Sequence, residues 1–130
     1  MKSVVICSSS RFAEEVREFS KQLKEKGVMV YEPSLYRASG GDWEKIRDFD
    51  KRFVALGLVH DHLHKIRLAD VVFVYNKEGY IGNSVTLEIG YALALNKPIY
   101  AFCDKDEEKC RKVLFQEFIS SPEELIKVLR

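Results

Sequence analysis

The chain has 130 residues, with 21 Lys and Arg against 20 Asp and Glu and a formal net charge of +1 at pH 7. This length fits a single domain, residues 1–130, that can bury its own core. The charge is nearly balanced and no dense basic run is present, which argues against a polymeric nucleic acid as partner.

The cysteines and the first residues indicate the compartment. Cys7, Cys103 and Cys110 are odd in number and lack CxxC or Cys/His zinc spacing, so we expect reduced thiols. The apolar run after Met1 is too short for a signal peptide or a membrane span. We therefore expect a soluble, cytoplasmic protein that does not bind a membrane.

Apolar runs and helical periodicity alternate along the chain. We expect strands at residues 4–7, 28–31, 71–75, 98–102 and 114–119. We expect helices at residues 11–27, 43–66, 84–96 and 104–112 and from residue 121 onward, with Gly57 as a point where the second can break. Residues 34–43 (SLYRASGGDW) contain a Gly-Gly pair and no clear period, which indicates a surface loop.

Continuous apolar strands that alternate with helices are typical of a parallel sheet covered on both faces. We predict an α/β fold, a doubly wound, flavodoxin-like three-layer sandwich with five parallel strands in the order 2-1-3-4-5. Ligands of such folds bind outside the carboxyl ends of the strands. The loops at residues 8–11 and 76–83 and the turn near Cys103 are therefore expected to form the site.

Glu88 is the only charged residue from position 84 to position 96, and apolar side chains surround it in the sequence. A carboxylate is rarely found in such surroundings without a partner or a function. It lies too far into the predicted helix to cap it, but near enough to the helix start for its charged form to be stabilised. A nucleophile or an acceptor for a sugar hydroxyl would be useful there; the structural alternative is a partner such as a buried amide or an arginine.

The run from Gly82 to Ala92 (GNSVTLEIGYA), followed by NKPI at residues 96–99, resembles the signature of the nucleoside 2-deoxyribosyltransferase-like superfamily. Its relatives include hydrolases of 2-deoxynucleoside 5'-monophosphates. The resemblance implies that Glu88 is a nucleophile that forms a covalent glycosyl-enzyme intermediate, and that the substrate is a small nucleoside or nucleotide. It also implies a homo-oligomer such as a homodimer, which agrees with a helix at 84–96 that is apolar nearly all round.

Cleavage of an N-glycosidic bond builds positive charge on the sugar, which a carboxylate can stabilise, and a second group must assist the departing base. Asp61 is our candidate, because nine helical residues before Asp70 raise it about 13 Å, to the active edge of the sheet. Asp70 belongs at the opposite edge. The resembling family has an acidic residue in this region at a spacing that differs by about one, and His62 is the alternative occupant.

The loops supply the remaining candidate residues. Hydroxyls, amides and a guanidinium at residues 8–11 could hold a 5'-phosphate, although a plain helix cap would use the same residues. The predicted substrate-binding residues are Ser8, Ser9, Ser10, Arg11, Asn76, Gly79, Tyr80, Gly82, Asn83 and Ser84.

No cofactor and no metal is expected. His60 and His64 share a helical face but lack a third ligand of defined position, and Cys7 is expected to be a small buried residue, since no histidine is evidently aimed at its thiol. Two other functions stay open: a non-catalytic module that senses nucleotides, and a TIR-like NAD glycohydrolase that uses a comparable glutamate.

Overall fold

The computed structural model of the chain describes residues 1–34 and 41–130. In this part four parallel strands form one sheet in the order β2-β1-β3-β4, with β1 at Val4–Cys7, β2 at Val30–Tyr31, β3 at Val71–Val74 and β4 at Ile99–Ala101. The alternating apolar runs therefore predicted the α/β class and the parallel sheet correctly. The predicted number of five strands is wrong.

The segment expected as the fifth strand makes one isolated parallel bridge, between Ala101 and Phe118. Its first residues continue the helical turn that follows Lys112, and the chain reaches the next helix soon after Phe118. Too few extended residues remain for a ladder, although the Ala101 N–H donates to the Glu117 carbonyl and the Ile119 N–H to the Ala101 carbonyl. The stretch thus lies beside β4 without becoming a strand.

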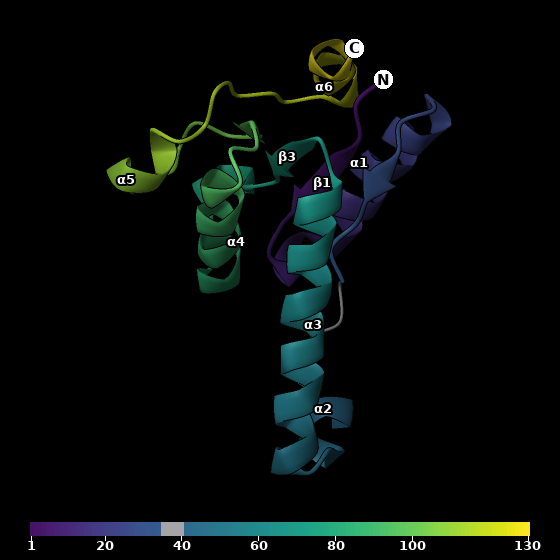
Figure 1. Cartoon of the computed structure of the whole chain (residues 1–130), viewed down its shortest axis with the longest axis vertical. Helices are drawn as coiled ribbons and strands as arrows, with labels where there is room; N and C mark the ends of the chain where they lie inside the picture. The colour runs from purple at the N-terminus through teal and green to yellow at the C-terminus, as the bar shows by residue number, and fades with distance from the viewer. Residues whose placement is uncertain (35–40) are drawn as a thin grey trace.

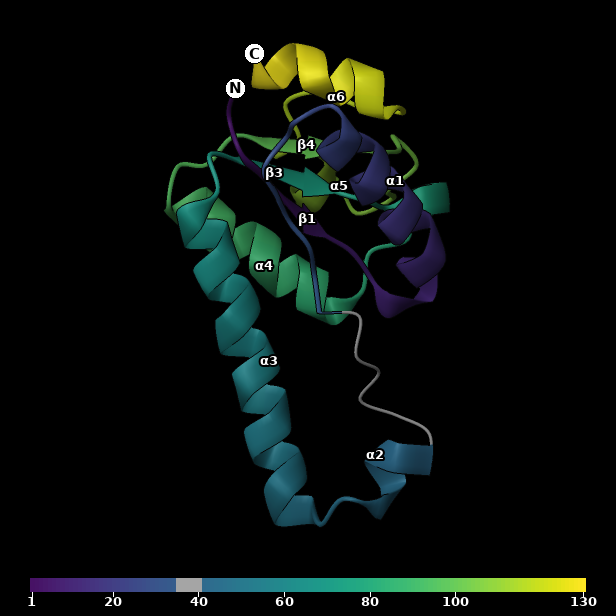
Figure 2. The same cartoon turned by 90° about the vertical axis from the view of Figure 1, so that its right-hand side faces the viewer.

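Helices cover both faces of the sheet (Figure 2). On one face, α1 (Ala13–Glu25) and α6 (Pro122–Leu129) pack over Val4, Ile6 and Phe73. On the other face, α3 (Asp48–Leu68) and α4 (Asn83–Ala94) pack over the side chains of the same strands that point the opposite way, such as Val5 and Val72. This three-layer arrangement follows from the alternation of side chains along a strand.

Local signals explain most helix ends. Ser121 accepts a hydrogen bond from the Glu124 N–H at 3.2 Å, as the capping sequence predicts. The Glu124 carboxylate accepts one at 3.0 Å from the N–H of Ser120, one residue before the cap. Gly27, which follows α1, adopts a φ of +83° that other residues rarely take. The short α5 (Lys109–Lys112) begins later than predicted because Glu108 caps it through the Cys110 N–H.

The long helix α3 projects from the body of the protein, as Figure 1 shows. It runs for 21 residues and continues through Gly57, so the helix does not break at this possible break point. The short α2 (Gly41–Lys45) lies at its far end. Of the loop predicted at 34–43, residues 35–40 lie outside the described residues, and the part from Gly41 onward belongs to α2. None of the described helices is both long and apolar enough to cross a membrane.

Candidate active site

Glu88 lies in the second turn of α4, the helix that follows the carboxyl end of β3. Its side chain is 13% exposed, and its Oε1 lies 3.3 Å from Nε2 of His62. Its second oxygen, Oε2, is buried and has no hydrogen-bond partner among the described residues. Such an atom normally has a partner, so this oxygen can accept a hydrogen bond from a group that enters the site or from a buried water.

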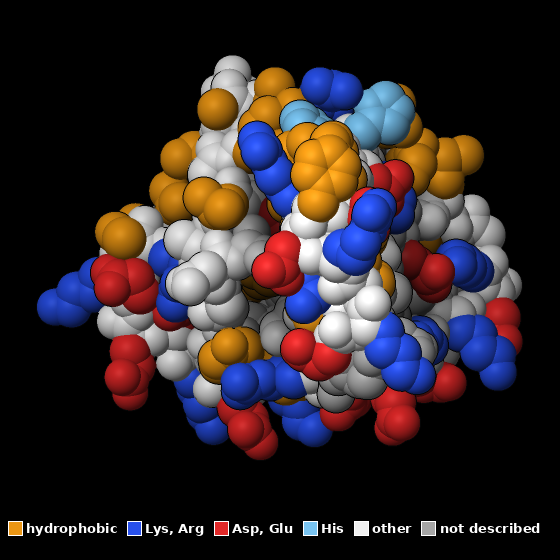
Figure 3. All heavy atoms as spheres, turned by 90° about the horizontal axis from the view of Figure 1, so that it is seen from below, with side chains coloured by type: hydrophobic (Ala, Val, Ile, Leu, Met, Phe, Trp, Pro, Cys, Tyr) orange, Lys and Arg blue, Asp and Glu red, His pale blue; other side chains and the backbone are white. Residues whose placement is uncertain are grey.

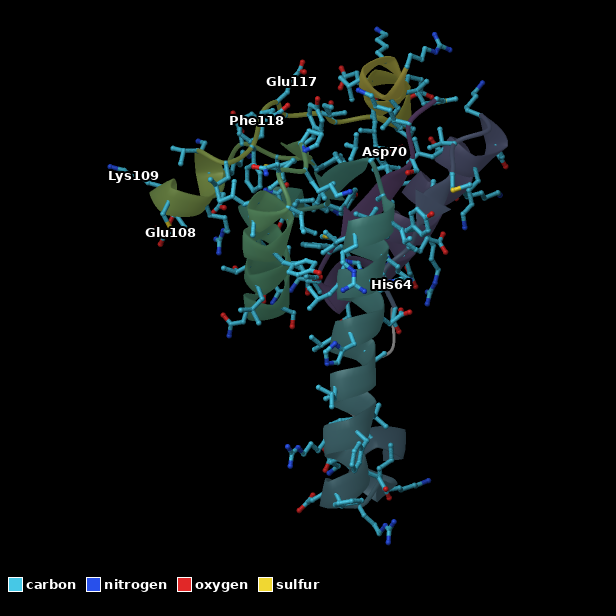
Figure 4. All side chains as sticks on the ribbon, viewed as in Figure 1. His64, Asp70, Glu108, Lys109, Glu117 and Phe118 are labelled. Carbon is cyan, nitrogen blue, oxygen red and sulfur yellow. The ribbon has the colours of Figure 1, made fainter. Side chains whose placement is uncertain are left out.

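His62 connects Glu88 to the sheet. It points inward from α3, and its Nε2 also lies 3.2 Å from the Sγ of Cys7 at the carboxyl end of β1. Nδ1 of the same ring is buried without a partner among the described residues. His60 and His64, in contrast, are exposed; in Figure 4 His64 lies part of the way along α3.

Burial shifts the ionisation of all three groups. It raises the pKa of Glu88 to about 8 and lowers the pKa of His62 to about 4, the latter with help from the charge of Lys65. Burial and then the charge of Glu88 raise the pKa of the Cys7 thiol. At neutral pH the three groups are therefore mostly uncharged, because a low dielectric penalises the charged form of each.

Asp61, the predicted general acid, is exposed on α3 and forms an ion pair with Lys65 at 2.8 Å. This hydrogen bond from Lys65 lowers the pKa of Asp61, which favours the carboxylate over the acid. The structure does not bring Asp61 to Glu88; the neighbouring residue, His62, takes that place. Asp70 lies at the other edge of the sheet (Figure 4), where its Oδ2 accepts hydrogen bonds from the Ser3 N–H and hydroxyl at 2.8 and 3.0 Å.

Residues 8–11 follow β1 directly and open a short 3-10 helix, η1 (Ser10–Phe12). Ser9 caps it by accepting a hydrogen bond from the Arg11 N–H at 3.3 Å, and the Ser8 hydroxyl donates to the Ser9 carbonyl at 3.1 Å. The Arg11 guanidinium lies 3.4 Å from the centre of the Tyr80 ring. Two predicted loops, one after β1 and one after β3, therefore meet through this cation–π contact.

The loop after β3 contains structural residues as well as open groups. Asn76 is buried, and its side-chain amide exchanges hydrogen bonds of 2.9 and 2.8 Å with the backbone of Cys103. Gly79, in the 3-10 helix η2 (Lys77–Gly79), has a φ of +83°, and a Cβ there would lie 2.4 Å from the Lys105 carbonyl oxygen. Both residues fix the path of the loop, beside any role in substrate binding.

The helix start that follows carries no side-chain cap. Gly82 is the residue before α4, and its successors Asn83 and Ser84 are exposed. Among the described residues, therefore, no side chain accepts a hydrogen bond from the first backbone N–H groups of α4. Uncapped amides at a helix N-terminus favour an anionic ligand.

A hollow of about 490 Å³ lies on the opposite face of the sheet, over α1. Its lining includes Glu15, Tyr75, Phe102 and Ser120, and none of the predicted site residues. We therefore build the site around Glu88, where buried polar groups lack partners, and not around this hollow.

The contact between His62 and Cys7 was not among the predicted features of the site. A signal for it exists in the spacing: His62 lies four positions before Ile66 and seven before Ala69, both fully buried, so the three share one face of α3. His60 and His64 lie on other sides of the helix. Of the three histidines, His62 is the one that shares a helical face with the apolar residues Ile66 and Ala69, and this spacing marks it as the inward-facing one.

The fold and these residues define a class: a parallel α/β sandwich with a buried glutamate at the carboxyl edge of the strands. The model of the family described as nucleoside 2-deoxyribosyltransferase matches residues 6–120. The chain belongs to this family. The match includes the end of β1, Glu88 and the bridge at Phe118, so the resemblance found in the helix of Glu88 extends over most of the chain.

Solved structures share the fold. One is described as a 2-deoxyribosyltransferase from the psychrotolerant bacterium Bacillus psychrosaccharolyticus; the TM-score is 0.67 at 16% identity, over 95% of this chain and 89% of that one. Another, a conserved protein from Enterococcus faecalis V583, has a TM-score of 0.54 at 16% identity, over 98% of this chain and 96% of that one. The search of curated proteins found no match.

Proposed function

We propose that this chain cleaves or transfers the N-glycosidic bond of nucleosides or nucleoside 5'-monophosphates, with Glu88 as the nucleophile. The observation that carries the proposal is the buried carboxyl of Glu88, whose Oε2 has no hydrogen-bond partner among the described residues. The chain also belongs to the nucleoside 2-deoxyribosyltransferase family. Membership of the family supports glycosyl transfer in general. The role of Glu88 as the nucleophile and the identity of the substrate are our inference.

In the proposed reaction the Glu88 carboxylate attacks the anomeric carbon of the sugar. The bond from this carbon to the base breaks, the electron pair leaves with the base, and the base takes a proton. The resulting glycosyl ester of Glu88 is then attacked by water, which gives hydrolysis, or by a second base, which gives transfer. Each step replaces one bond at the anomeric carbon: the first exchanges the bond to the base for the ester bond to Glu88, and the second breaks that ester and regenerates the carboxylate.

We infer that His62 positions the nucleophile. Its low pKa keeps the imidazole neutral near pH 7, so an Nε2–H can donate to Oε1 of Glu88 and hold the carboxylate in place. Asp61 is less well placed to protonate the base, since it is exposed and bound to Lys65. The variants His62→Gln and Asp61→Asn separate the two residues: the first should lower base release strongly and the second only slightly.

For the substrate we propose that a 5'-phosphate binds between residues 8–11 and the start of α4. The guanidinium of Arg11 and the uncapped amides after Gly82 support this position. Replacement of Arg11 by Gln should then raise KM for a 5'-monophosphate more than KM for the matching nucleoside. An equal change for both substrates would place the phosphate elsewhere.

We also propose that the protein is a homo-oligomer. The projecting part of α3 exposes Phe49, Phe53, Leu56 and Val59, between 47% and 68% of each, and the Phe49 and Phe53 rings pack 4.9 Å apart. Seen from below, hydrophobic side chains gather on one side of this end of the molecule, with histidines beside them (Figure 3). Phe53→Ser should shift the mass measured by light scattering toward the monomer. The equally apolar and exposed Val113, replaced by Ser, is the matched control.

The decisive experiment incubates the protein with a panel of nucleosides and 5'-monophosphates and measures free base by chromatography. Glu88→Ala should abolish base release, and Glu25→Ala, which removes an exposed carboxyl of α1, should leave it unchanged. Mass spectrometry of the quenched reaction should find the sugar on the peptide that contains Glu88. Base release that persists in Glu88→Ala would eliminate the mechanism.

One observation favours the alternative of a non-catalytic module that binds nucleotides. The raised pKa of Glu88 leaves only about a tenth of this group ionised at pH 7. A sensing module would bind a nucleotide with unchanged affinity in Glu88→Gln, and the parent would release no base at any pH. Inclusion of NAD in the panel tests the glycohydrolase alternative in the same assay.

A further inference from the structure

Three side chains of different ligand types, one of them the proposed nucleophile, meet at the carboxyl edge of the sheet. Cys7 from β1, His62 from α3 and Glu88 from α4 bring one ligand atom each within 4.8 Å of one another. The Cys7 Sγ lies 3.2 Å and the Glu88 Oε1 3.3 Å from the same atom, Nε2 of His62. We call this group the Cys7–His62–Glu88 cluster.

We propose that the cluster binds one thiophilic divalent cation of the zinc type per chain, through Sγ of Cys7, Nε2 of His62 and Oε1 of Glu88. Thiolate, imidazole and carboxylate are the three ligand classes that zinc takes from proteins. With the usual zinc bond lengths and tetrahedral angles, the ligand atoms stand about 3.4 to 3.6 Å apart. The two separations that include Nε2 are shorter than this by only a few tenths of an ångström, and the third, between Sγ of Cys7 and the carboxyl of Glu88, lies within 4.8 Å. Side-chain shifts that bring the thiol and the carboxyl closer together therefore admit the ion.

The arrangement differs from that of a catalytic triad with a cysteine nucleophile. In a triad the carboxylate binds one ring nitrogen of the histidine and the nucleophile contacts the other. Here the thiol and the carboxyl both approach Nε2, and Nδ1 has no partner among the described residues. A single nitrogen lone pair cannot relay a proton between two groups on its own side, but it can share a metal ion with them.

Charge supports the same conclusion. In the described part of the chain, no Lys or Arg side chain forms an ion pair with Glu88 or Cys7; the nearby Lys65 is bound to Asp61. A thiolate and a carboxylate carry two negative charges, which a divalent cation neutralises within a buried site. Binding releases the thiol proton to solvent, together with the carboxyl proton where present. It also requires the imidazole tautomer with hydrogen on Nδ1, so Nε2 gives up its hydrogen to solvent and Nδ1 takes one up.

The geometry also limits the affinity. The cluster offers three protein ligands, which leaves a fourth position for water, and Nδ1 lacks the carboxylate or carbonyl that usually supports a metal-bound histidine. We therefore expect binding that a chelator reverses, weaker than that of a closed four-ligand site. The consequence for activity rests on the proposed function: an ion on Oε1 neutralises the nucleophile, so metal binding and glycosyl transfer exclude each other.

The test uses reduced full-length protein that has been freed of metal with EDTA and transferred to chelator-free buffer. Titration with Co²⁺ should produce, at one ion per chain, the visible bands of tetrahedral cobalt and the near-ultraviolet absorption of a thiolate–cobalt bond. Zn²⁺ should abolish both. Cys7→Ser should lose the thiolate absorption, and Cys110→Ser, which changes an exposed thiol of α5, should keep it. No thiolate absorption in the parent, or absorption that survives Cys7→Ser, would overturn the proposal.

Two histidine variants keep the proposal testable if Cys7→Ser does not fold. His62→Gln should weaken Co²⁺ binding at least tenfold, and His64→Gln, which changes an exposed histidine of the same helix, should not. Equal affinities of the two variants would refute the site. Inhibition is measured separately: Zn²⁺ should suppress base release by the parent and EDTA should restore it. A metal-free parent that releases no base refutes the proposed function, while the cobalt result still decides the metal site.

Discussion

Replacement of Glu88 by Gln should change how the stability of the protein depends on pH. The pKa of Glu88 is about 8 in the folded chain, against 4.5 for the unperturbed group. Between these values the folded chain holds a proton that the unfolded chain releases, so the free energy of unfolding falls as the pH rises. Gln has the shape of the protonated acid and cannot ionise, so the variant lacks this loss.

The magnitude follows from the size of the shift. One pKa unit corresponds to about 1.4 kcal/mol, so the full shift of Glu88 is an upper limit of about 5 kcal/mol, reached above pH 8. His62 acts in the opposite sense, because its pKa falls from 6.5 to about 4 on folding and stability therefore rises with pH between these values. The two contributions cancel between about pH 4.5 and 6.5. In the parent the loss becomes visible from about pH 6.5 to 8.

Urea denaturation in EDTA at pH 5, 7 and 9 measures the effect. The parent and Glu88→Gln should have similar free energies of unfolding at pH 5, and the variant should be the more stable by several kcal/mol at pH 9. Glu25→Gln, which changes an exposed carboxyl of α1, should run parallel to the parent at all three values. Parallel curves for the parent and Glu88→Gln would refute the reasoning, because they would mean that Glu88 ionises normally in the folded chain.

Three further outcomes are expected. Base release under kcat/KM conditions in EDTA should rise from pH 6 to a plateau above about pH 8, as Glu88 ionises; a decline over this range would contradict a carboxylate nucleophile. Asn76→Ala should destabilise the chain by about 2–4 kcal/mol in urea, because two backbone groups of Cys103 lose their partners. Gly79→Ala should lower the melting temperature, because the new Cβ meets the Lys105 carbonyl. Gly90→Ala, which adds a Cβ in open space on α4, should raise it by the equivalent of about 0.5–1 kcal/mol. Equal shifts for the two variants would show that the approach to Lys105 does not restrict residue 79.

The sequence predicts the sheet well because each central strand is a continuous apolar run. It predicts less well which apolar side chains are buried in the core. Phe49 and Phe53 keep helical spacing as core residues do, yet both are exposed on α3. Periodicity shows that a helix has an apolar face, but it does not show whether that face meets the helix's own sheet or another chain. The stretch before Phe118 fails as a strand for a similar reason, since a nearby helical turn uses part of it.

In the site, Glu88 could be found from the sequence because it is the single charge in an apolar helix. Its neighbour could not be assigned with the same certainty. The rise per residue places Asp61 at the correct height, but the next residue, His62, is turned by about 100° around the helix axis. That rotation decides which of the two faces the sheet. The contact of His62 with Cys7 joins residues that lie 55 positions apart. The spacing of His62 from Ile66 and Ala69 indicates an inward-facing histidine, but no local pattern shows which strand residue it meets.

The backbone N–H of Lys2 donates to the carbonyl of Leu129 at 2.8 Å, so the two ends of the described chain are held together at the amino edge of the sheet (Figure 1). Glu88 lies toward the carboxyl edge. An affinity tag, a fluorescent fusion or a surface linker joined next to Lys2 or Leu129 would therefore emerge on the side away from Glu88. Protein immobilised through either position should present the side with Glu88 to the medium.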